Sequence, residues 1–106
     1  MGADELSRKV DLLVRQVSHW SAPRWAGPNR NDGTSRADLF HRLVQRLADL
    51  AADAEGVPRR EVPRLENDLV LPDQLRVIAA DLLAANPPAE ALAEATELVA
   101  WVRVNL

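Results

Sequence analysis

The sequence predicts an all-α fold, and three observations lead to this prediction. The apolar residues are mostly Leu, Val and Ala, and the only aromatic residues are Phe40 and three Trp, a composition that favours helix over strand. Apolar positions recur at helical spacing in four stretches, and turn-forming residues separate these stretches. The length of 106 residues suits one core. We therefore expect a single domain over residues 1–106, an irregular four-helix bundle with two long irregular connections.

The first helix is predicted over residues 4–20. Its apolar positions are spaced by four, three, one, three and three residues, which places them on one face: Leu6, Val10, Leu13, Val14, Val17 and Trp20. Leu12 falls outside this stripe. Residues 21–34 hold two Pro, two Gly and two Asn, which indicate turns. A connection of this length is often functional.

The second helix is predicted over residues 35–55. Ser35 suits the N-cap, and Asp38 three residues later resembles the acidic member of a capping box. Gly56 suits the residue after the helix, and Pro58 prevents continuation. The second long connection, residues 57–71, contains enough apolar residues to pack partly on the bundle.

The third and fourth helices are predicted over residues 72–85 and 88–105. Pro72 suits the first helical position of the third helix, and Asn86-Pro87-Pro88 ends it. Because the fourth helix follows almost at once, these two helices are expected to form a tight antiparallel hairpin.

Composition excludes several classes of function. Without cysteine there are no disulfides, thiolate metal sites or cysteine nucleophiles. No apolar run approaches the roughly 20 residues that span a membrane, and no export signal is visible, so we expect a cytoplasmic protein without membrane association. The bias towards Arg and Ala suggests a GC-rich bacterial genome.

Several apolar residues lie outside the stripes of their helices. Trp101 projects among Glu90, Glu94 and Glu97, away from the apolar stripe of the fourth helix. The second connection could cover it through Leu65, Leu69 and Val70, and we favour this internal cover. The alternative is an interface with a protein partner or a second copy. Its candidate residues are Trp101, Val104, Trp25, Leu12 and Val77. The best functional hypothesis is therefore a small non-catalytic interaction or accessory protein.

A ligand-binding or enzymatic bundle is the first alternative function. Its pocket would lie near the 21–34 loop and would be lined by His19, Trp20, Trp25 and His41. The two histidines could join Asp32 or Asp38 in a metal site, although no metal-binding or catalytic motif supports this arrangement. We therefore expect no cofactor, no metal and no catalytic residues.

A nucleic-acid-binding regulator is the second alternative. Residues 24–64 contain eight Arg, including Arg36, Arg42 and Arg46 on the second predicted helix. Six acids are interleaved among them, and the sequence pI is about 5.3. Because a clearly basic footprint is missing, nucleic-acid binding is unlikely.

Overall fold

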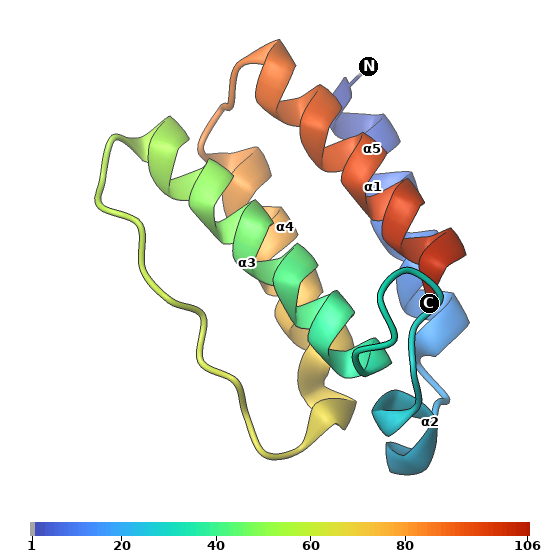
Figure 1. Cartoon of the computed structure of the whole chain (residues 1–106). Helices are drawn as coiled ribbons and strands as arrows, with labels where there is room; N and C mark the ends of the chain where they lie inside the picture. The colour runs from blue at the N-terminus through green and yellow to red at the C-terminus, as the bar shows by residue number, and fades with distance from the viewer. Residues whose placement is uncertain (1) are drawn as a thin grey trace.

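The computed structural model describes residues 2–106, and most of them are helical (Figure 1). There is no strand within this range, only an isolated bridge between Pro28 and Ser35. The prediction of an all-α fold is therefore confirmed. The elements are α1 (Gly2–Val17), α2 (Ala22–Ala26), α3 (Arg36–Glu55), the 3-10 helix η1 (Asp68–Val70), α4 (Leu71–Ala84) and α5 (Ala89–Asn105).

The first predicted helix and connection differ from the observed ones. α1 ends at Val17, three residues before the predicted end, and the short helix α2 occupies part of the expected loop. Ser21 caps α2 by accepting a hydrogen bond from the backbone N–H of Arg24, and a Pro stands in the first turn. The chain turns at the start of α2, and α2 packs against α3.

The four long helices run in two parallel pairs. Gly2 lies against Leu92, and the amide of Gln16 donates a hydrogen bond to the carbonyl of Arg103, so α1 and α5 are parallel neighbours (Figure 1). α3 and α4 form the other parallel pair. α1 also contacts α4, and α3 also contacts α5.

The predicted tight hairpin of the last two helices is wrong in its packing. α4 and α5 run in opposite directions, yet they lie diagonally across the core, and their neighbours are α1 and α3 (Figure 1). Asn86 adopts a left-handed conformation with φ of 55°, and Pro87 and Pro88 follow it. Because proline fixes an extended path, the turn carries the chain across the bundle and not back onto α4.

The core lies between the four long helices. α3 contributes the most buried residues, as its wide apolar face predicts. The predicted cap of α3 is present, because the side chain of Ser35 accepts a hydrogen bond from the N–H of Asp38. Gly56 ends the helix in the left-handed conformation with φ of 71°, where an L side chain would be strained.

The second connection does not cover Trp101, so the favoured prediction of an internal cover is wrong. Residues 57–67, here called the strap, run back along α3 to the start of α4, on the side of the molecule opposite α5 (Figure 1). Polar contacts hold the strap there: the Gln45 side chain bonds both Arg60 and Val62. Leu65 and Leu69 remain about half exposed, and Trp101 is 41% exposed.

Within residues 2–106, none of the helices combines the length and the apolar character needed to cross a membrane.

Candidate functional site

The residues of the predicted interaction surface do not lie together. Trp25 is completely buried, so its inclusion was wrong; its ring packs edge-on against Trp20 and Phe40, with centroids 5.0 and 5.2 Å away. Val77 is exposed, but it lies on α4 beside the strap. The remaining three residues are exposed on α1 and α5: Leu12, Trp101 and Val104.

The parallel packing of α1 and α5 sets the level of these residues along the molecule. Gly2 is level with Leu92 and Gln16 with Arg103. Counting along both helices from these contacts places Leu12 level with residues 99–102, which include Trp101. Leu12 and Trp101 are therefore two large exposed apolar residues at about the same height on neighbouring helices.

Charges of opposite sign accompany these apolar residues. α1 exposes Arg8 and Arg15, whereas α5 exposes Glu90 and Glu97. Within residues 2–106 these four side chains make no ion pair. The same count along the helices places Arg8 level with Glu97. We call the exposed residues Arg8, Leu12, Glu97, Trp101 and Val104 the α1–α5 face.

The alternative pocket near residues 21–34 does not form as predicted. His19 is exposed, and the Nε2 atom of His41 lies 3.0 Å from the carbonyl oxygen of Val62 in the strap. Trp20 and Trp25 are buried and pack edge-on against each other, so they do not line an open pocket between the two histidines. Across residues 2–106 there is no group of three His or acidic side chains placed to hold a metal ion, so the two histidines do not join Asp32 or Asp38 in the arrangement considered from the sequence.

Half of the eight arginines in the predicted nucleic-acid surface are paired with acids. Arg42 bonds Asp32, Arg46 bonds Glu94, and Arg59 bonds Asp53. Arg64 bonds both Asp38 and Asp68. The hydrogen bond from Arg64 lowers the pKa of Asp38, and the bond from Arg59 lowers the pKa of Asp53. These pairs leave little uncompensated positive charge along α3 and the strap.

Four other arginines surround a cavity of about 360 Å³ beside the C-terminal end of α5. They come from four separate segments: Arg24, Arg30, Arg36 and Arg103. Gln16, Trp20, Val104 and Leu106 complete the lining. We call this site the arginine pocket. Sequence reasoning missed it because Arg103 lies far along the chain from the other three, in a segment whose net charge is negative.

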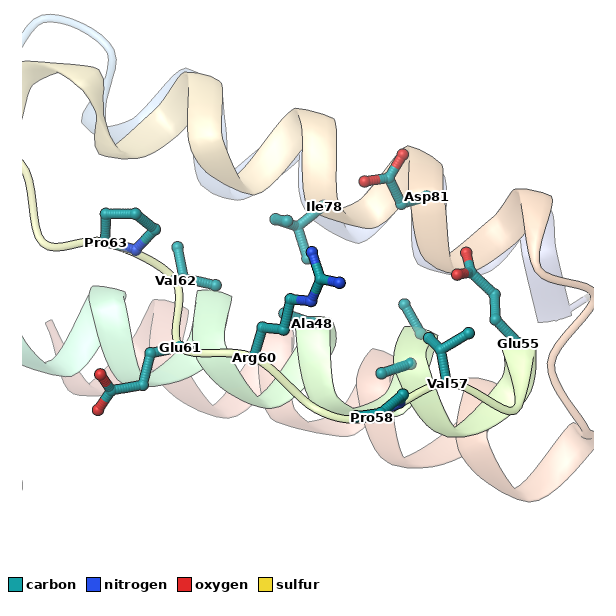
Figure 2. A pocket seen from close by; sticks show the side chains of 12 residues that line it. Ala48, Glu55, Val57, Pro58, Arg60, Glu61, Val62, Pro63, Ile78 and Asp81 are labelled. Carbon is teal, nitrogen blue, oxygen red and sulfur yellow. The ribbon is translucent and has the colours of Figure 1, made fainter.

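Another cavity, of about 520 Å³, lies between α3, the strap and α4. Ala48, Ala51 and Ala52 leave this space open, and Figure 2 shows Arg60 of the strap extending across it towards α4. Glu55 and Asp81 line one end, and both are exposed. This cavity therefore offers space without a buried ionisable side chain.

No model of a protein family matches the chain, and comparisons with curated proteins and with solved structures find no match.

Proposed function

We propose that this chain is a non-catalytic interaction module that pairs with a second copy of itself through the α1–α5 face. The observation that carries the proposal is the exposure of Trp101. Its side chain is 41% exposed, and no other segment within residues 2–106 covers it. Tryptophan is among the residues most enriched in interface hot spots. An exposed Trp on a helix face is therefore a strong candidate for the centre of an interface.

The charges of the α1–α5 face select one pairing. In a symmetric dimer the same surface of both copies meets itself. A two-fold axis parallel to the helices places α1 of each copy on α5 of the other, at the same height. Leu12 then meets Trp101 of the second copy, and Arg8 meets Glu97 of the second copy. An axis perpendicular to the helices instead places α1 on α1 and brings arginines together, which is unfavourable.

The wider description of the molecule belongs to the same proposal. The four long helices form an irregular four-helix bundle, a single domain that works in the cytoplasm of a bacterium. Its composition supports this setting, because the chain has no cysteine and strongly prefers Arg to Lys.

Light scattering on the purified chain tests the pairing. The wild type is expected to approach twice the mass of 11.7 kDa as the concentration rises. Trp101→Glu places a charge at the centre of the interface. Because truncation of a hot-spot residue lowers the binding free energy by about 2 kcal/mol or more, this variant is expected to remain monomeric. Circular dichroism should show unchanged helicity, because the side chain lies outside the core.

Val77→Glu is the matched control. It introduces the same charge at an apolar residue that is more exposed than Trp101, on a different helix. It is expected to leave the dimer intact. A wild type that stays monomeric at high concentration would refute the proposal, as would equal effects of the two variants.

Charge reversal tests the orientation of the pairing. Arg8→Glu and Glu97→Arg each place like charges opposite one another, so each is expected to weaken the dimer. The double variant restores opposite charges and should recover much of the lost affinity. If the double variant is as weak as the sum of the single variants, the axis parallel to the helices is wrong.

A further inference from the structure

The arginine pocket gathers residues from all parts of the chain. Arg24 belongs to α2, Arg30 to the following loop, Arg36 to the first turn of α3, and Arg103 to the last turn of α5. The loop is attached to α5 by a hydrogen bond of 2.8 Å from the N–H of Arg30 to the carbonyl of Asn105. Because this bond joins the two backbones, Arg30 and Arg103 are held on the same side of the molecule.

The four guanidinium groups have no carboxylate partner within residues 2–106. Five other arginines, in contrast, each bond an Asp or Glu side chain. If Leu106 carries a free α-carboxylate, that group compensates one of the four positive charges, and three remain uncompensated. A local excess of positive charge thus occurs in a chain whose formal net charge is −3.

Two of the four arginines are fixed in position. Arg36 donates to the carbonyl of Arg24 at 2.9 Å and to that of Leu106 at 3.4 Å. The guanidinium carbons of Arg24 and Arg36 lie 4.8 and 5.8 Å from the centre of the Trp20 ring, where cation–π attraction holds them. These contacts orient the groups before any ligand arrives, which reduces the entropy lost on binding.

Gly27 makes room for this arrangement. A Cβ atom at Gly27 would lie only 2.5 Å from the Nη1 atom of Arg36. The φ of Gly27 is −66°, which any residue adopts, so the backbone conformation does not require glycine here. Gly27 therefore matters for the close approach of the Arg36 side chain.

We propose that the arginine pocket binds a phosphate group. Four like charges around one cavity repel each other, and an anion placed between them removes that repulsion. The planar guanidinium fork matches the oxygens of phosphate and carries charge at every physiological pH. A dianionic phosphate compensates more of this charge than a carboxylate does. Val104 belongs both to the α1–α5 face and to the lining of the pocket, but Trp101 takes no part in the pocket and none of the four arginines belongs to the α1–α5 face.

The pocket is a local site and not an extended basic track. Its cations surround one cavity, whereas four other arginines of α3 and the strap each pair with an acid: Arg42, Arg46, Arg59 and Arg64. A nucleic acid needs a series of phosphate contacts along its backbone. The geometry therefore favours one phosphate group, either as the free ion or carried by a small molecule or a peptide.

Titration of the full chain with inorganic phosphate tests the proposal. Binding is measured by calorimetry and by Trp20 fluorescence, both in a Trp101→Phe background. Saturable one-to-one binding is expected. Arg30→Gln removes a charge from the pocket and should weaken binding about tenfold, because a hydrogen bond to a charged group contributes at least this much. Arg59→Gln removes a charge outside the pocket and is the matched control, with unchanged affinity.

Gly27→Ala keeps all four charges but displaces Arg36, so a loss of affinity in this variant would show that geometry matters and not only charge. Thermal melts identify a variant that fails to fold. If Arg30→Gln does not fold, Arg30→Lys is used in its place, because it keeps the positive charge but lacks the planar guanidinium group. A phosphoserine peptide, its unphosphorylated twin and a short DNA duplex distinguish the carrier of the phosphate.

Three results would overturn the proposal: no saturable phosphate binding, equal losses for Arg30→Gln and Arg59→Gln, or DNA binding that phosphate does not displace. The variants also separate this site from the dimer. Trp101→Glu should bind phosphate normally, and Arg30→Gln should form the same dimer as the wild type.

Discussion

Asp32 is the central acceptor of the loop that positions the arginine pocket. Its carboxylate accepts hydrogen bonds from the hydroxyl and the N–H of Thr34, from the amide of Asn29, and from Arg42. The bonds from Thr34 and Asn29 hold the pKa of Asp32 well below its ordinary range. Asn29 is 5% exposed and also bonds the carbonyl of Thr34. One carboxylate thus organises the residues between Pro28 and Ser35.

The lowered pKa of Asp32 predicts a loss of stability in acid. The folded state keeps this carboxylate ionised, whereas the unfolded chain protonates it near pH 4. The stabilisation is therefore complete above about pH 4 and is lost as the pH falls towards the folded-state pKa. Urea unfolding should show the wild type more stable than Asp32→Asn at pH 6, with a smaller difference at pH 2.5. Equal differences at both values would contradict this account.

The burial of the tryptophans was only partly predictable from the sequence. Trp20 falls on the stripe of its predicted helix and is buried, as expected. Trp25 lies in a segment rich in Pro and Gly, so its complete burial was not predictable from periodicity. α2 is only five residues long, too short to produce a helical repeat, and Ser21 followed two residues later by Pro23 was the only available signal.

Helix boundaries were predictable where a side chain or a glycine marks them. Ser35 and Gly56 bound α3 as expected, and α4 begins one residue from its predicted start. The end of α1 was predicted late, because Trp20 continues the apolar spacing after the helix has ended. Trp20 is buried although it follows the helix, so its burial reflects tertiary packing and not helical periodicity.

Removal of the α3 cap gives a prediction at the scale of the element. Ser35→Ala leaves the N–H of Asp38 without its 2.9 Å partner and is expected to lower the free energy of unfolding by about 1 kcal/mol. Ser18→Ala is the control, because Ser18 is exposed and its hydroxyl lies 3.5 Å from the acceptor. Its effect should stay within about 0.5 kcal/mol. Denaturant midpoints of the two variants provide the comparison, and an equal loss would refute the capping role.

The arrangement of the whole molecule was less predictable than its elements. Helical stripes indicate which face of a helix is buried, but they do not identify the neighbour that covers it. For that reason the diagonal packing of α4 and α5, the path of the strap and the assembly of the arginine pocket were all missed. The positions of Leu12 and Trp101 outside the stripes of their helices were predictable, whereas the exposure of Trp101 and the similar height of the two residues depend on tertiary packing.

The attachment of the strap gives a prediction for the whole molecule. Gln45 donates to the carbonyl of Arg60 and accepts from the N–H of Val62. Gln45→Ala removes both bonds, so the strap should open more often while the core keeps its packing. Limited digestion with trypsin should then cut faster after Arg59 or Arg60. Gln16→Ala, which removes a side-chain bond on the opposite side, should leave the cleavage rate unchanged.

The pairing of α1 with α5 also has a consequence for biosynthesis. α1 is synthesised before its parallel partner α5, and residues 18–88 are made between the two helices. At about 5–20 residues per second, several seconds separate the synthesis of the two helices. During this interval the apolar stripe of α1 lacks the neighbour that covers it in the native protein. The core therefore closes only after α5 has been made, and the apolar stripe of α1 stays partly uncovered until then.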